Sequence, residues 1–265
     1  MKRYPLRGKA LLISGASGGL GAALALECAR RGARLALCSR DLKATALVAA
    51  KATSLGSPLV KAYALDVGSS KSVKAAVAKA SRDLGGLDVL INNAGIHFFS
   101  DVEAMPEESL AKVLDTNLFG PIRLIKELMP LMRRQRGGLI VNIGSTLGLR
   151  SIPGGGGYAA SKAALARVSE SLRVEAMPYG VRVLHVSPGV VVTRLRQRAL
   201  YQGKPPASST TLPFPRSAEK TAMEIADAME SGKRELLSAA FPVKVFMLLV
   251  ARLAPGWVDK RMLKS

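Results

Sequence analysis

A tyrosine and a lysine four residues apart are the side chains of this sequence best suited to acid–base chemistry. Tyr158 and Lys162 stand in the run Tyr-Ala-Ala-Ser-Lys, and residues i and i+4 of a helix share one face. A fixed ammonium near a phenol favours the phenolate and lowers the tyrosine pKa from its reference of about 10. The phenol could then exchange a proton with a carbonyl or alcohol oxygen. Because the same spacing also occurs in solvated surface pairs, the rest of the chain must decide.

A glycine-rich turn lies near the N-terminus. The run Ser-Gly-Ala-Ser-Gly-Gly-Leu-Gly at 14–21 stands between a short apolar segment and a helical pattern. Glycines allow positive φ and close approach of the backbone to a phosphate, and a helix N-terminus offers N–H groups and a positive dipole end. A simple tight turn is the alternative. Its position after the first expected strand favours dinucleotide binding.

The end of the second apolar segment bears on which dinucleotide is bound. An acidic residue there would hydrogen-bond the adenosine ribose, whereas a basic one accommodates a 2′-phosphate. Arg40 could pair with that phosphate, and Ser39 could donate to it. Asp41 could instead bind the ribose, but its position is more typical of a helix N-cap. The pattern favours NADP(H) over NAD(H).

Short apolar runs alternate with longer helical patterns along the whole chain. This alternation predicts βαβ units and one α/β domain, a Rossmann-type doubly wound parallel sheet with helices on both faces. The expected strands are 10–14, 35–38, 60–65, 89–91, 139–143, 181–186 and 235–238, and the expected helices are 19–31, 41–55, 70–84, 106–134, 157–178 and 217–231. The Pro-rich stretch 194–216 is expected to lack regular structure and to act as a lid or binding loop.

Taken together, these motifs resemble the short-chain dehydrogenase/reductase family over roughly residues 8–240. The glycine motif carries Ser14 where a threonine is commoner, and Ser145 precedes Tyr158 by the thirteen positions that the family shows. The matching signatures are Ser14–Gly21, Asp66-Val67, Asn92-Asn93-Ala94-Gly95, the tetrad Asn117, Ser145, Tyr158 and Lys162, and Pro188-Gly189 with Thr193.

The resemblance implies a role for each matched residue. Tyr158 would donate the proton in reduction and accept it in oxidation, while Ser145 would hydrogen-bond the same substrate oxygen. Lys162 would lower the pKa of Tyr158 and hold the nicotinamide ribose. Asn117 would disturb its helix and bind a water that connects Lys162 to solvent; without the tetrad, it would be interpreted as a side chain competing with the backbone. The expected cofactor contacts are Gly15, Ser17, Gly18, Gly19, Leu20, Gly21, Ser39, Arg40, Asp66, Val67, Asn93, Ala94, Gly95, Tyr158, Lys162, Pro188, Gly189, Val191 and Thr193.

Two features beside the tetrad stay open at this stage. The glycine run at 154–157, directly before Tyr158, either makes room for a bulky substrate or forms a wide turn. His97, just after the Asn-Asn-Ala-Gly signature, could touch substrate, but a structural hydrogen bond in a loop is the favoured interpretation.

Composition restricts the partners and the compartment. The 265 residues include 39 Lys+Arg against 19 Asp+Glu, a formal net charge of +20, which suits nucleic acid, anionic lipid or an acidic carrier protein. The basic residues are scattered and not interleaved with aromatics, so nucleic-acid binding is not expected. Cys28 and Cys38 are expected to be buried, reduced thiols of a cytoplasmic protein rather than a disulfide or a metal site. No segment reaches the ~20 apolar residues that would span a bilayer.

The C-terminal residues 241–265 are interpreted as an appendage to the catalytic domain 1–240, which includes the substrate loop 190–216. An apolar helix is expected to begin near Pro242 and to stop before Pro255. Trp257, Lys260, Arg261 and Lys264 follow it and are suited to a membrane interface. Packing over the protein's own substrate pocket or against a partner subunit remains the alternative.

The sequence therefore predicts an NADP(H)-dependent oxidoreductase that interconverts a carbonyl and a secondary alcohol. Family members with a similar tail often act on lipid-like substrates, which implies a hydrophobic substrate here, by analogy alone. Reduction of a ketoacyl thioester on an acidic carrier protein is the main alternative, because the net charge suits such a partner. A non-catalytic NADP-binding regulator is disfavoured by the complete tetrad. The resemblance also implies a homodimer or homotetramer formed through the helices near 106–134 and 157–178.

Overall fold

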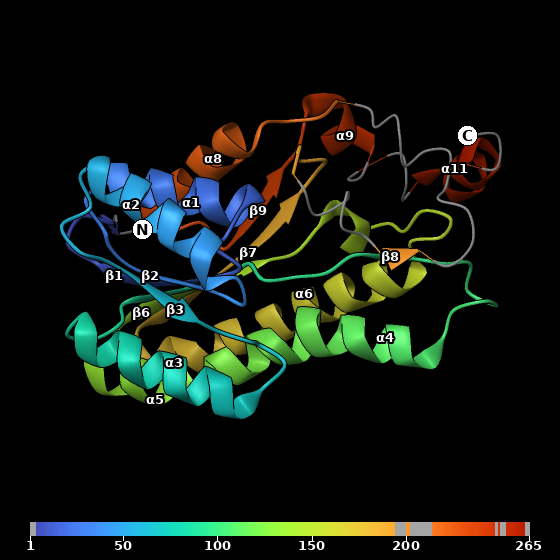
Figure 1. The fold of residues 1–265 in the computed structure, drawn as a ribbon. Coiled ribbons are helices and arrows are strands. Elements are labelled where there is room, and N and C mark those ends of the chain that lie inside the picture. Colours follow the sequence, from blue (N-terminus) through green and yellow to red (C-terminus); the bar gives the residue numbers. More distant parts are fainter. Residues whose placement is uncertain (1–3, 194–199, 202–213, 247–248, 250–252, 263–265) are drawn as a thin grey trace.

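A parallel sheet of seven strands forms the centre of the protein (Figure 1), in the order β3-β2-β1-β4-β6-β7-β9. The computed structural model describes residues 4–193, 200–201, 214–246, 249 and 253–262. Each of the seven predicted strands is present, with ends within two residues of the expected ones. The strands are β1 (Ala10–Ser14), β2 (Arg34–Ser39), β3 (Val60–Ala64), β4 (Val89–Asn92), β6 (Gly138–Ile143), β7 (Val181–Pro188) and β9 (Glu235–Ser238).

Helices cover both faces of this sheet, as predicted (Figure 1). Along β1, Leu11 and Ile13 join a core with the helices of one face, while Ala10 and Leu12 join a second core with those of the other. Both faces are buried, so the strands are apolar throughout rather than alternating. One face carries α1 (Gly19–Arg30), α2 (Leu42–Ser54) and α8 (Ala218–Ser231), and the other carries α3 (Ser70–Asp83), α5 (Gly120–Gln135) and α6 (Gly156–Ala176).

The strand order places the candidate residues at one edge. All neighbouring strands are parallel, so their carboxyl ends share that edge. The order reverses between β1 and β4, and such a switch point forms a crevice outside the strand ends in doubly wound sheets. The glycine turn leaves β1 and the Asn93 segment leaves β4, so these two motifs lie on either side of the crevice.

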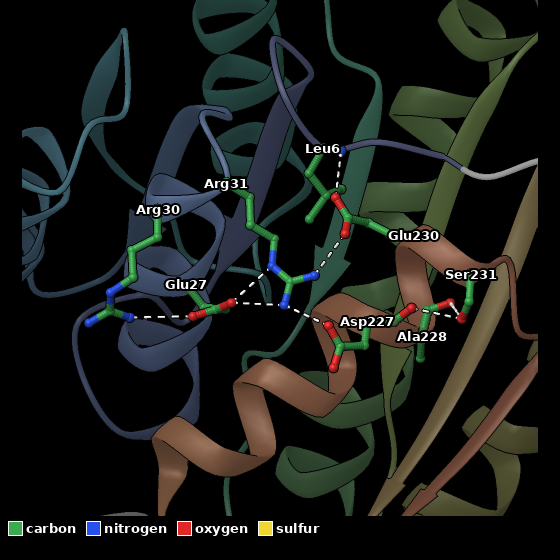
Figure 2. Close-up of polar contacts among 8 residues, drawn as sticks. All are labelled: Leu6, Glu27, Arg30, Arg31, Asp227, Ala228, Glu230 and Ser231. Carbon is green, nitrogen blue, oxygen red and sulfur yellow. Dashed lines mark hydrogen bonds and ion pairs between the residues drawn. The ribbon is translucent and has the colours of Figure 1, made fainter.

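An ion-pair cluster holds α1 against α8 (Figure 2). The Arg31 guanidinium contacts carboxylates of Glu27, Asp227 and Glu230 at 2.7–2.9 Å. Glu230 also accepts a hydrogen bond from the backbone N–H of Leu6 at 3.0 Å. The helix that follows the glycine turn is thereby fixed to α8 and to the N-terminal segment, away from the crevice.

Two segments differ from the prediction. The helix expected at 106–134 is divided into α4 (Glu107–Leu114), a π-helical turn (Asp115–Phe119) and α5. Within the stretch expected to lack regular structure, β8 (Leu200–Tyr201) pairs in parallel with β5 (Phe98–Phe99). The remaining residues 194–199 and 202–213 lie outside the described residues. Two-residue strands carry no periodicity that a sequence could reveal, because they form only where tertiary contacts bring them together.

The C-terminal region contains α9 (Phe241–Val245) and α11 (Pro255–Met262). A helix begins beside Pro242, as expected, and helical Leu253 is followed by a break at Ala254, before Pro255. The helix that Pro255 starts was not predicted. Proline suits the first helical position, because its missing N–H needs no partner there. Among the described residues, no helix is both long and apolar enough to cross a membrane. Cys28 and Cys38 are free and buried, as predicted.

Candidate active site

The four predicted tetrad residues lie together at the carboxyl end of β6. Tyr158 and Lys162 share the buried face of α6, and the Lys162 ammonium lies 5.8 Å from the centre of the Tyr158 ring. Ser145 follows β6, and its hydroxyl hydrogen-bonds the Tyr158 phenol. The Ser145 oxygen also accepts from the backbone N–H of Leu147 at 3.1 Å. A proton-exchanging phenol and a second hydroxyl are thus directed at one point.

Burial has the largest effect on the pKa values of Tyr158 and Lys162. It raises the pKa of Tyr158 to about 12, and the Ser145 hydrogen bond partly offsets the rise. It also lowers the pKa of Lys162 to about 8. The predicted lowering of the Tyr158 pKa by Lys162 is therefore wrong for the protein by itself. The Lys162 ammonium donates to the backbone carbonyl of Ile143 at 2.8 Å, and the loss of hydration disfavours the charged form of both residues.

Asn117 lies inside the π-helical turn and is fully buried. Its Oδ1 accepts from the Ile96 N–H at 2.9 Å, and its Nδ2 donates to the Ile96 carbonyl at 3.0 Å and to the Ser161 hydroxyl at 3.1 Å. The expected disturbance of the helix is confirmed by this turn. Both amide hydrogens are used within the protein, so the side chain is a clamp on the segment after β4. The water link to Lys162 stays a prediction.

The glycine turn has the shape of an anion cradle. Gly15 and Gly19 have φ of +68° and +55°, which L side chains rarely adopt. A Cβ on Gly21 would lie 2.2 Å from the Gly15 carbonyl oxygen, and one on Gly15 would lie 2.8 Å from Ala94 Cα. Gly18 faces open space, and no described side chain caps the start of α1. Free N–H groups and room beside them fit the pyrophosphate of a dinucleotide.

The Asn93 side chain stabilises this glycine turn by hydrogen bonds. Its Nδ2 donates to the carbonyls of Ser14 and Gly15, both at 3.1 Å. The Ser14 hydroxyl in turn accepts from the N–H groups of Asn93 and Ala94 at 3.0 and 3.1 Å. The Asn93 side chain therefore supports the turn, and the cofactor contact expected at this residue stays a prediction. Gly95 follows, where a Cβ would lie 3.7 Å from Lys162 Nζ.

The end of β2 differs from the prediction at Ser39. The Ser39 hydroxyl lies 2.7 Å from the Thr45 hydroxyl and accepts from the Asp41 N–H at 3.0 Å. Bonded inside the first turn of α2, this hydroxyl is not placed to donate to a phosphate. Asp41 is the helix N-cap, as expected, and accepts from the Ala44 N–H at 2.9 Å. Arg40 is exposed at the strand end, and its contact with the adenosine ribose stays a prediction.

Asp66 and Val67, which were expected to contact the cofactor, follow β3, the strand next to β2. Asp66 is exposed, and its Oδ1 accepts from the Gly68 N–H at 3.0 Å. Val67 is buried, and a Cβ on Gly120 would lie 2.9 Å from its side chain. Asp66 is thus free at its second oxygen to meet a ligand, while Val67 anchors the strand end on α5.

The stretch after β7 reaches back to the glycine turn. A Cβ on Gly19 would lie 3.1 Å from the side chain of Thr193, so these two predicted contacts are adjacent. Pro188 ends β7, and the Gly189 N–H donates to the Ser238 carbonyl at 2.8 Å. Val191 forms a bridge with Arg216. The two ends of the stretch 194–216 are therefore fixed side by side.

The glycine run before Tyr158 serves close packing. A Cβ on Gly157 would lie 3.0 Å from Met105 Sδ, and one on Gly156 would lie 3.3 Å from Val102. Larger residues would push away the loop that leads into α4. This loop packs on the start of α6, just before Tyr158, and the sequence did not reveal Val102 and Met105, because neither belongs to a motif.

Comparisons with known proteins agree with this geometry. The family model described as short chain dehydrogenase matches residues 9–202. Dehydrogenase/reductase SDR family member 7B from Bos taurus is 32% identical, over 97% of this chain and 80% of its own length. Retinol dehydrogenase 8 from Homo sapiens is 37% identical, over 73% of this chain and 62% of its own length. The chain thus spans less than two thirds of that second relative.

Solved structures share the fold. The alcohol dehydrogenase from Thermococcus sibiricus, complexed with 5-hydroxy-NADP, has a TM-score of 0.76 at 29% identity and covers 87% of this chain and 95% of its own. The 3-ketoacyl-(acyl-carrier-protein) reductase from Brucella melitensis, complexed with NADH, has a TM-score of 0.78 at 25% identity, over 88% and 97% of the two chains. Similar folds therefore bind either dinucleotide.

Proposed function

The chain belongs to the short-chain dehydrogenase/reductase family, and from this premise we propose that it is an NADP(H)-dependent oxidoreductase of a hydrophobic carbonyl or secondary alcohol. One observation carries the proposal: the hydrogen-bonded hydroxyls of Ser145 and Tyr158 lie at the sheet edge that also carries the glycine cradle. In this proposal residues 1–240 form the catalytic part, and residues 241–265 are appended to it.

The side chains suit a proton transfer coupled to hydride transfer. When bound, a nicotinamide cofactor supplies or accepts the hydride. In the reducing direction, Tyr158 gives its proton to the substrate oxygen, and Ser145 stabilises the charge that develops there. Lys162, whose pKa is about 8, is the neighbour able to exchange a proton near neutral pH. The cradle at 15–21, Arg40, Asp66 and Thr193 would hold the dinucleotide.

Arg40 supports the preference for NADP(H), because it is the exposed cation at the strand end that faces the adenosine ribose. We expect Arg40→Ala to weaken NADPH binding about tenfold to hundredfold and to leave NADH binding almost unchanged, since a charged hydrogen bond is worth about 1.5–3 kcal/mol. Fluorescence titration with each nucleotide measures the two dissociation constants. Lys43→Ala removes another exposed cation near the start of α2 and is the matched control. Equal losses for both nucleotides would contradict the phosphate contact.

The proposed substrate class rests on the surroundings of the tetrad and on one relative. Val102 and Met105 lie beside Gly156 and Gly157 at the start of the Tyr158 helix, and Phe99 stacks on His97, which stacks on Tyr158. Retinol dehydrogenase 8 is named for a lipid-like alcohol. The test is NADPH consumption with long-chain ketones, retinoids, steroids and ketoacyl thioesters. Highest kcat/KM on a ketone or aldehyde of the first three classes supports the proposal.

A ketoacyl reductase is the second candidate, favoured by the Brucella melitensis structure and by the net charge of +20. Its substrate would be carried by an acidic protein. Turnover of a carrier-bound thioester that falls steeply as salt rises would favour it, because salt screens the attraction between opposite surface charges. Turnover of free lipids that is insensitive to salt would exclude the carrier.

We also propose that the C-terminal helices touch a lipid surface. Phe241, Leu253 and Trp257 are 78%, 81% and 54% exposed, and α11 is tied to the loop after Ser145 by an ion pair between Arg150 and Asp259. A membrane at α11 would thus lie beside the site that a lipid substrate must enter. Figure 1 shows α9 and α11 at the same end of the molecule as β8.

The membrane contact predicts a measurable loss of binding. We expect removal of residues 242–265, or the pair Phe241→Ser and Trp257→Ser, to lower sedimentation with anionic vesicles several-fold, since each buried aromatic contributes about 1.5–3 kcal/mol. Leu47→Ser on α2 changes a residue that is 75% exposed elsewhere and is the matched control. Unchanged sedimentation of both variants would exclude the contact.

A further inference from the structure

Three aromatic rings are stacked beside the candidate catalytic phenol. The His97 imidazole lies 3.9 Å from the Tyr158 ring centre, with 20° between the planes, and 4.2 Å from the Phe99 ring, with 28° between the planes. All three side chains are buried, His97 at 5% exposure. The histidine therefore fills the space between the phenol and the β5 segment.

We propose that His97 is a positioning residue, which fixes the plane of the Tyr158 ring and so directs its hydroxyl. The Ser145 hydrogen bond restrains the phenol at one end only, and a ring held at its hydroxyl can still tilt and turn about its own axis. A flat partner at 3.9 Å removes this freedom. The expected effect of His97 on turnover rests on the proposed function, but its effect on the orientation of the Tyr158 ring does not.

The backbone around His97 is itself held on both sides. The preceding residue, Ile96, is bonded through both its N–H and its carbonyl to Asn117. On the other side, Phe99 pairs with Tyr201 in the small sheet, and the Ser100 N–H donates to the Gly154 carbonyl at 2.9 Å. A residue between two such anchors cannot shift without disturbing them.

This arrangement gives Asn117 a defined effect on the phenol. Its side chain reaches the Tyr158 ring through Ile96 and His97. It also donates to the Ser161 hydroxyl, which in turn donates to the Tyr158 carbonyl at 2.7 Å. Asn117 thus secures the backbone of Tyr158 through Ser161 and the plane of its ring through His97. The two buried contacts converge on one catalytic side chain.

The geometric part is tested by NMR on the full-length protein with ¹³Cε-labelled tyrosine. The chain has five tyrosines, and the signal lost in Tyr158→Phe identifies Tyr158. Ring currents of the stacked imidazole displace this signal, so we expect His97→Ala to move it toward the position of an unstacked tyrosine. His97→Phe keeps a flat ring at this place and is expected to retain a displaced signal. No movement in His97→Ala would overturn the proposal.

The kinetic part uses the best substrate of the panel. We expect His97→Ala to lower kcat up to about tenfold, with KM changed less than twofold, because loss of an aromatic pair weakens positioning by roughly that factor. His97→Phe should restore most of kcat. A rise in KM with unchanged kcat, or loss in the phenylalanine variant equal to that in the alanine variant, would make His97 a substrate contact and overturn the positioning role.

The two measurements separate this inference from the proposed function. If the wild type turns over no compound, the NMR signals still decide whether His97 fixes the ring, while the proposed function fails. If the Tyr158 signal moves in His97→Ala and kcat does not fall, the ring is stacked but its plane is irrelevant to turnover, and the positioning role is overturned.

Discussion

The variant Tyr158→Phe is expected to lose turnover by about a hundredfold to ten-thousandfold and to keep its fold and its nucleotide affinity. This range is typical of removing a general acid or base. The change deletes one oxygen and leaves the ring, so the stack with His97 is retained. Ser145 loses the phenol but keeps its bond from the Leu147 N–H. Rates of NADPH consumption, nucleotide titration and thermal unfolding measure the three properties.

A second buried tyrosine provides the control for this prediction. The Tyr63 hydroxyl donates to Asp83 at 3.0 Å, on the outer strand β3 and away from the tetrad. Tyr63→Phe removes the same atom and is expected to leave kcat within twofold, although loss of the hydrogen bond to Asp83 costs about 0.5–1.5 kcal/mol of stability. If Tyr158→Phe also kept its turnover, the phenol would not be the proton donor, and a non-catalytic nucleotide-binding role would gain support.

The sheet could be predicted almost completely from the sequence, because its physics is local and repetitive. A strand covered by helices on both faces must be apolar at every position, and residues such as Leu11, Leu12 and Ile13 satisfy this on both sides. The glycine turn could also be predicted from the sequence, since a side chain at position 21 would clash with the Gly15 carbonyl and only glycine fits there. Asp41 as a helix N-cap follows from one side chain and three neighbouring residues.

The remaining features depend on distant parts of the chain and could not be read in this way. Ser39 seemed placed to bind a phosphate until the fold brought Thr45 to it. His97 stacks on a tyrosine 61 positions away, and no periodicity records such a contact. The direction of the Tyr158 pKa also escaped, because a spacing of four residues indicates proximity to Lys162 but does not indicate burial. Burial is a property of the whole fold, and here it has the largest effect on the Tyr158 pKa.

The same burial makes Lys162 lower the free energy of unfolding at neutral pH. We therefore expect Lys162→Met to stabilise the protein at neutral pH and to abolish its turnover. Burial lowers the Lys162 pKa from 10.5 to about 8. Between these values the unfolded chain binds a proton that the folded chain does not, so the folded state loses stability as the pH falls from 10.5 to 8. Below pH 8 the loss is complete, and it amounts to about 3 kcal/mol. Methionine avoids this cost but leaves the Ile143 carbonyl without its donor, at about 1–3 kcal/mol.

The pH dependence of the melting temperature shows whether Lys162→Met stabilises the protein by removing a buried charge or by improving the packing. At pH 7 the methionine variant should melt above the wild type. At pH 10.5 the order should reverse, because Lys162 is then neutral in the folded state and half neutral in the unfolded state, so little of the cost of neutralising it remains. Thermal unfolding from pH 7 to 10.5 locates the pH at which the two melting temperatures cross. The control variant Lys74→Met, at an exposed position of α3, is expected to show no such crossing. A parallel offset at all pH values would contradict a cost of charge burial. A crossing would mean that Lys162 is kept in spite of its effect on stability, as a group retained for the proton chemistry at Tyr158 would be.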